Sequence, residues 1–175
     1  MSHLNLSHFY RMILVIMILL LQACAAQDKS GPTMKVGMHI DAVLEFAMEY
    51  PLDWSKDRRV AYGSSNGEVR WTPQDNDNIM LRIVSQVLDE VPSKEDSLTL
   101  FISALEGLEI TLEEELEDQH DLVLHLTGRT ANQDIEAYLL QKGKRIYQLM
   151  LTTPPDTMDS YTGIMVRVSQ SFQKL

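Results

Sequence analysis

The feature that most constrains the fold is a pair of apolar segments, residues 135–141 and 144–152, joined by Lys142-Gly143-Lys144. A strand with one covered face alternates apolar and polar side chains. Here Ile135 to Leu140 and Ile146 to Leu151 place apolar side chains on both faces. A sheet that is apolar on both faces needs a covering layer on each. The pattern therefore predicts a hairpin at the centre of an antiparallel sheet that lies between two helical layers.

The first covering helix is predicted after Ser93, because Ser93-Lys94-Glu95-Asp96 is a capping box. Its acids Glu95 and Asp96 lie in the first turn, where the helix dipole favours negative charge. We expect the helix to end near Gly107, with one apolar face formed at spacings of three and four residues. The residues of that face are Leu98, Phe101, Ile102, Leu105 and Leu108.

The second covering helix is predicted at the C-terminus. Pro154-Pro155 ends the preceding strand, and Asp156 or Thr157 can cap a helix. Gly163 weakens this helix by about 1 kcal/mol relative to alanine, unless a close contact needs the space. The apolar stripe that would face the sheet consists of Met158, Tyr161, Met165, Val168 and Phe172.

Alternating apolar runs predict five more strands, and turn residues separate them. Asp57-Arg58-Arg59 is predicted to be a loop, and so is Gly63 to Gly67, where Asn66-Gly67 is a strong turn signal. The predicted fold class is α+β, an antiparallel β-sheet sandwiched between helices in an α/β/α arrangement. The five strands are residues 43–50, ending at Pro51, and residues 68–72, 79–88, 110–116 and 122–127.

The N-terminus has the three parts of a secretory signal: a polar lead, an apolar run from Met12 to Leu21, and small residues. As a helix this run would rise about 15 Å, half the hydrocarbon thickness of a bilayer, so we expect a signal that is removed. Leu21-Gln22-Ala23-Cys24 resembles the bacterial lipobox, although Gln22 is larger than the usual residue there. The resemblance implies cleavage after Ala23 and attachment of diacylglycerol to Cys24. The alternative is a plain secretory signal.

Three segments follow from this interpretation: a signal peptide (1–23), a lipidated N-terminus with a flexible tether (24–38), and a folded domain (39–175). Acyl chains contribute about 0.8 kcal/mol per buried methylene, so two or three of them hold a protein on a membrane. The tether spans about 20 Å root-mean-square. We therefore expect a membrane-anchored protein of the cell envelope that faces the periplasm. Ala25 stands where, by resemblance, an aspartate signals inner-membrane retention, and this favours the outer membrane.

The chain is acidic, with 15 Lys and Arg against 25 Asp and Glu. The leader carries one arginine and no acid, so the mature chain has 14 bases against 25 acids, a net charge of −11. This charge excludes nucleic acid as a partner. Between Asp89 and Asp121 there are twelve acids and a single base, Lys94. The segment is either a solvated surface, a docking surface for a basic partner, or a weak cation site.

Three short motifs between Val43 and Phe172 carry a family resemblance. They are Tyr50-Pro51-Leu52-Asp53-Trp54, Gly128-Arg129-Thr130-Ala131, and the closing segment from Tyr161 to Ser171-Phe172. Together they resemble the PsbP/Mog1-like fold and its bacterial relatives, many of them small lipoproteins. The resemblance implies an antiparallel sheet sandwiched by helices. It implies no activity, because relatives serve as photosystem assembly subunits or as a small-GTPase partner, and no functional residue is carried over.

The sequence contains no nucleotide-binding loop, HExxH motif or nucleophile elbow, so we predict no catalytic residue, no cofactor and no metal ligand. His120 and His125 are five positions apart and would face opposite sides of an unbroken strand, which makes them poor co-ligands. Trp54 and Trp71 either line a groove for a small ligand or cover the core.

The leading hypothesis is a non-catalytic, lipid-anchored module that binds or helps to assemble a protein partner at the membrane surface. The alternative is a small-ligand-binding or enzymatic domain with a pocket near Trp54 and Trp71, and a third possibility is a cation sensor. The candidate interaction residues are Glu113, Glu114, Glu115, Glu117 and Asp118.

Overall fold

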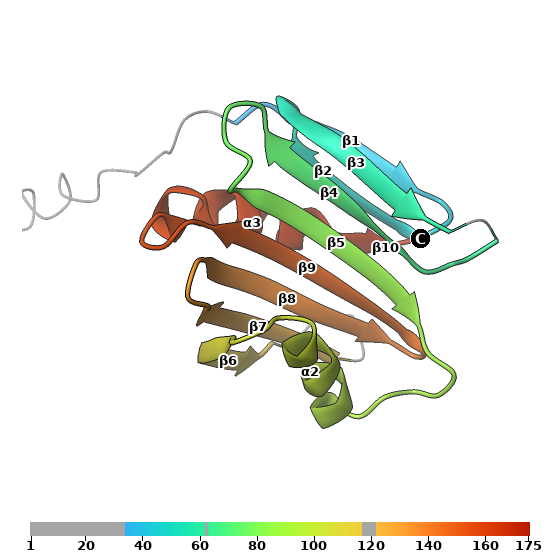
Figure 1. Ribbon diagram of the computed structural model, residues 1–175. Helices are drawn as coiled ribbons and strands as arrows, with labels where there is room; N and C mark the ends of the chain where they lie inside the picture. The colour runs from blue at the N-terminus through green and yellow to red at the C-terminus, as the bar shows by residue number, and fades with distance from the viewer. Residues whose placement is uncertain (1–33, 62, 117–121) are drawn as a thin grey trace, which may run out of the picture. The chain divides into compact units, whose positions relative to one another are not determined.

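The computed structural model describes residues 34–61, 63–116 and 122–175, which form two antiparallel sheets and two α-helices (Figure 1). The predicted signal peptide, Cys24, Glu117, Asp118 and His120 lie outside these ranges. The strands are β1 (Val36–Asp41), β2 (Phe46–Pro51), β3 (Trp54–Val60), β4 (Gly67–Pro73), β5 (Met80–Val87), β6 (Glu109–Glu115), β7 (Leu122–Arg129), β8 (Asp134–Lys142), β9 (Arg145–Thr153) and β10 (Gln173–Lys174). The helices are α2 (Lys94–Ser103), the 3₁₀ turn η1 (Met158–Ser160) and α3 (Thr162–Ser171).

The predicted central hairpin is confirmed as β8 and β9. The seven-stranded sheet has the order β3-β4-β5-β9-β8-β7-β6, so the hairpin has neighbours on both sides. The two strands pair from Asp134 with Thr153 to Lys142 with Arg145, and Gly143 takes a positive φ of 57° in the turn. Both faces are buried, because Leu149 packs into one apolar cluster and Met150 into the other.

One face of the large sheet is covered by α2, and the other by α3 together with the small sheet β1-β2-β10. The prediction of two purely helical layers is therefore only partly confirmed. As a helix of ten residues, α3 is about 15 Å long and cannot cover seven strands, so β1 and β2 complete the layer. The cluster under α2 comprises Phe101, Leu124, Leu126, Ile135, Ala137, Leu139 and Met150. The cluster on the other face includes Phe46, Met48, Trp71, Leu149, Met165, Val168 and Phe172.

The capping box of α2 is present as predicted. The Ser93 hydroxyl accepts a hydrogen bond from the Asp96 backbone N–H at 3.1 Å, and the Asp96 carboxylate accepts one from the Ser93 N–H at 3.4 Å. The helix ends at Ser103, before the expected Gly107. Leu105 and Leu108 nevertheless pack against the cluster from the turns that follow. Ile102, predicted to be on the apolar face, is 36% exposed.

The C-terminal helix α3 buries Met165 and Val168 as the predicted stripe requires. Met158 and Tyr161 precede the helix, in and after η1, and are partly buried against the same cluster. Among the described residues, no atom lies within 4 Å of a Cβ added at Gly163, so no close contact among them requires a glycine there.

Two segments that were predicted to be irregular are strands. Residues 36–38, assigned to the tether, begin β1, which pairs with β2 from Val36 opposite Pro51 to Asp41 opposite Phe46. Asp57-Arg58-Arg59, predicted to be a loop, lies in β3. Because residues 55–59 are all exposed, β3 shows no hydrophobic period and is held by its pairing with β4.

Candidate functional site

The predicted acidic surface centres on β6, the last strand of the large sheet. Glu113, Glu114 and Glu115 are all exposed. Their side chains alternate, so Glu113 and Glu115 lie on the face covered by α2 and Glu114 lies on the other. Lys94 Nζ is 3.2 Å from Glu113 Oε1 and 3.3 Å from Glu115 Oε2, and these contacts raise the pKa of Lys94. The one base of this region is thus already paired, and Glu114 projects on the opposite face.

Across from Glu114, β7 and β8 carry a polar cluster that sequence reasoning missed. His125 is the cross-strand partner of Glu114, and its Nε2 lies 3.2 Å from Glu136 Oε1. The ring of Tyr138 stacks on His125 with centroids 4.5 Å apart. Glu136 is 4% exposed, and burial raises its pKa while the contact with His125 opposes the shift. The signal available in the sequence was a glutamate within the apolar segment 135–140.

At the other end of the large sheet, Asp41 joins the two sheets. Its carboxylate accepts two hydrogen bonds from Arg58 of β3, from Nε at 2.6 Å and from Nη2 at 3.0 Å. It also accepts hydrogen bonds from the backbone N–H groups of Val43 at 3.1 Å and Leu44 at 3.0 Å. The hydrogen bonds from Arg58 are the main reason that the pKa of Asp41 falls to about 2. Because the guanidinium and the carboxylate satisfy each other, this pair is best explained as a structural clasp.

His39, two residues earlier in β1, is buried among aromatic rings. Its ring centroid lies 5.2 Å from that of Trp71 and 5.5 Å from that of Phe46. Within the described part of the chain, His39 Nε2 and Trp71 Nε1 are both buried without a hydrogen-bond partner. Burial is the largest cause of the lowered pKa of His39, with Lys56 adding to it, while Asp41 opposes it. The site therefore favours a neutral imidazole.

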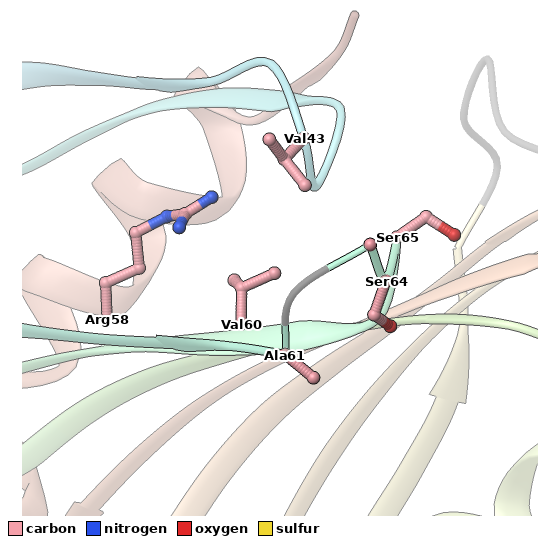
Figure 2. Close-up of a pocket in the computed structure, with 7 residues that line it drawn as sticks. Val43, Arg58, Val60, Ala61, Ser64 and Ser65 are labelled. Carbon is pink, nitrogen blue, oxygen red and sulfur yellow. The ribbon is translucent and has the colours of Figure 1, made fainter.

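A shallow hollow of about 540 Å³ opens beside the Asp41–Arg58 pair. Figure 2 shows Arg58 and Val60 pointing from β3 toward the β1–β2 turn that carries Val43, with Ser64 and Ser65 at the far side. The hollow is open to solvent, and Arg58, which lines it, is already bound to Asp41. Its walls thus offer no enclosed set of convergent polar groups for a small ligand.

The groove near Trp54 and Trp71, which was one of the two interpretations of these residues, is not formed. Trp71 has no exposed surface and packs in the core with His39 and Tyr50. Trp54 is half-buried and contacts Tyr161, with ring centroids 6.5 Å apart. Of the two interpretations, the structure supports the one in which these tryptophans belong to and cover the core.

Residues 34–61, 63–116 and 122–175 contain no group of three or more His, Cys, Asp or Glu side chains placed to hold a metal ion. Over the same residues, no helix is both long and apolar enough to cross a membrane.

The layers described above define an α+β protein with an antiparallel sheet between a helix and a mixed layer. It has the PsbP/Mog1-like fold, as the sequence motifs implied. The solution structure of cyanobacterial PsbP (CyanoP) from Synechocystis sp. PCC 6803 matches it with a TM-score of 0.60 at 13% identity, over 86% of this chain and 98% of that one. At this identity the likeness shows the fold alone.

Two weaker likenesses accompany it. A crystal structure from Bacteroides thetaiotaomicron VPI-5482 has a TM-score of 0.48 at 12% identity, over 81% of this chain and 49% of that one. LpqN, described as involved in cell envelope biogenesis of Mycobacterium tuberculosis, has a TM-score of 0.47 at 12% identity, over 82% and 86% of the two chains. The chain matches no protein-family model and no curated protein.

Proposed function

We propose that this chain is a lipid-anchored protein of the cell envelope whose folded domain is a non-catalytic module that binds or helps to assemble a protein partner. The anchor is Cys24 in Leu21-Gln22-Ala23-Cys24, with the domain facing the periplasm and the outer membrane favoured. The observation that carries the binding role is β6, an edge strand with exposed acids on both of its faces.

An edge strand presents unpaired backbone groups, and charged side chains along it prevent pairing with arbitrary strands. Three adjacent glutamates, Glu113 to Glu115, therefore restrict this edge to partners that bring compensating positive charge. Lys94 neutralises part of the charge on the α2 face, which leaves Glu114 as the strongest attraction for a basic group. Glu117 and Asp118 follow in sequence and would extend the same acidic surface.

The test is crosslinking of the full lipidated chain in its own host, followed by affinity capture and mass spectrometry. The variant Glu113→Gln/Glu114→Gln/Glu115→Gln removes the three charges from β6. Asp53→Asn/Asp75→Asn/Asp77→Asn removes the same number from exposed acids elsewhere and is the matched control. We expect the control and the natural chain to recover the same partner and the β6 variant to lose it, with capture weakened by salt. Equal recovery by both variants would remove β6 from the proposed function.

A further inference from the structure

The outer face of the small sheet exposes large apolar side chains. Along β1, His39 and Asp41 are 7% and 4% exposed, whereas Met38 and Ile40, which point the opposite way, are 57% and 65% exposed. Leu175 follows β10 and is 55% exposed, and its N–H bonds to the Glu45 carbonyl at 3.0 Å. Single exposed apolar residues are ordinary, but the strand register places all three of these on the outer face of one small sheet.

The small sheet also carries no uncompensated acid in residues 36–51, because each of the three acids there is paired with an arginine. Asp41 lies 2.6 Å from Arg58 Nε, and Glu45 lies 3.3 Å from Arg145 Nη2. Glu49, the cross-strand partner of Met38, lies 2.5 Å from Arg167 Nε. The acids of β1 and β2 and the turn between them are therefore compensated, in contrast to the exposed run of acids on β6.

Within the described domain, β1 lies beside one edge of the large sheet and the acidic strand β6 forms the other edge. Asp41 ties β1 to β3, which is the first strand of the large sheet, whereas β6 is the last. Six inter-strand spacings separate β3 from β6, roughly 29 Å. This is more than three times the screening length of about 8 Å at physiological salt, so the charges of β6 act only weakly at β1.

The anchored end of the chain arrives at this same face. Val36, the first residue of β1, is twelve positions after Cys24. In general, a linker of twelve residues without regular structure spans about 20 Å root-mean-square, which is less than the distance from β3 to β6. An anchor at Cys24 would therefore keep the start of β1 near the bilayer.

We infer that the outer face of the small sheet, which exposes Met38, Ile40 and Leu175, rests on the lipid bilayer and fixes the orientation of the domain on the membrane. The inference rests on the proposed lipid anchor and deepens it. The acyl chains supply the attachment, and the apolar side chains, inserted among the headgroups, select one orientation.

The test uses the full lipidated chain in vesicles of phosphatidylethanolamine and phosphatidylglycerol. Cys24 is the sole cysteine, and once acylated it cannot take a thiol label, so a new cysteine is labelled alone. Ile40→Cys and Met38→Cys place an environment-sensitive fluorophore on the proposed contact. Leu112→Cys places it on β6, at a residue that is 43% exposed. Circular dichroism confirms that each labelled chain is folded.

We expect spin-labelled lipids to quench most of the emission at positions 40 and 38, with a blue shift, and to leave position 112 nearly unchanged. Equal quenching at positions 40 and 112, or none at either, overturns the inference while an acylated mass for Cys24 leaves the anchor intact. If copies labelled at position 40 quench one another and the spin-labelled lipids do not quench them, the inference is overturned, and a second copy of this chain covers the face instead. A mass without acyl groups removes both the anchor and the inference.

Discussion

Arg58 of β3 and Asp41 of β1 form a two-point ionic clasp between the two sheets, with Nε 2.6 Å from Oδ2 and Nη2 3.0 Å from Oδ1. Asp41 is buried, whereas the Arg58 side chain is 38% exposed. Four donors converge on this carboxylate, because Val43 and Leu44 add their backbone N–H groups. The clasp holds the β1–β2 turn over the edge of the large sheet.

Replacement of Asp41 by alanine is expected to lower the free energy of unfolding by about 2 to 3 kcal/mol, because it leaves several donors unsatisfied. The same carboxylate contributes to acid stability. Its pKa falls from 3.8 to about 2 on folding, so this stability is present above pH 3.8 and is lost as the pH falls toward 2. Urea unfolding measures both effects.

Asp57→Ala is the matched control for the clasp. Asp57 also pairs with an arginine, Arg59, at 2.8 Å, but both side chains are more than half exposed. Its removal should change stability by less than about 0.5 kcal/mol. Similar losses for Asp41→Ala and Asp57→Ala would show that the clasp contributes no more than a surface ion pair.

His39 predicts a second acid-sensitive range at higher pH. Folding lowers its pKa below 6.5, so the unfolded chain binds the proton more readily than the folded one. Its contribution to stability is therefore present above pH 6.5 and is lost as the pH falls below that value. His39→Phe keeps an aromatic ring among Trp71, Phe46 and Tyr50 but cannot titrate.

Chemical unfolding at a series of pH values just below 6.5 checks the role of His39. We expect the natural chain to weaken across this range and His39→Phe to remain flat. If His39→Phe keeps the full slope, the buried imidazole is not its source.

Gly163→Ala is expected to raise the free energy of unfolding by about 0.4 to 1 kcal/mol, because alanine restricts the unfolded chain and favours the helix. No atom in the part of the chain that the structure describes lies within 4 Å of the added Cβ. Gly128 is the contrasting site, since a Cβ there would lie 2.7 Å from the Glu109 carbonyl oxygen. Thermal unfolding should show Gly163→Ala stabilised and Gly128→Ala destabilised. A loss of stability in Gly163→Ala would contradict the prediction.

Cys24→Ser tests the anchor without altering the described domain. We expect the variant to lose radiolabelled fatty acid and to leave the membrane fraction, because the serine hydroxyl does not replace the thiol that is alkylated. Circular dichroism of the released chain should match that of the natural protein. Retention of fatty acid by the variant would rule out Cys24 as the point of attachment.

The candidate site was predictable in part. The exposure of Glu113 to Glu115 follows from a run of charge that no core can accept, and the structure has all three in solvent. For Trp54 and Trp71 the sequence left a groove and a core position open, because an aromatic residue in a strand gives the same pattern in either place, and the structure supports the core position. The contact between His125 and Glu136 joins two strands through their register, and no local pattern in the sequence specifies that register.

By itself the sequence determined the centre of the fold, because two adjacent strands that are apolar on both faces can be buried only in the middle of a sheet. It also determined the start of α2, because a capping box is a local hydrogen-bonding motif. Only the tertiary structure decided that β1 and β3 are strands. β3 is polar and exposed, and it forms because β4 supplies backbone partners and Asp41 holds Arg58. These interactions outweigh the local preference for a loop. Because they come from residues distant in the chain, they leave no hydrophobic period in the sequence of β3.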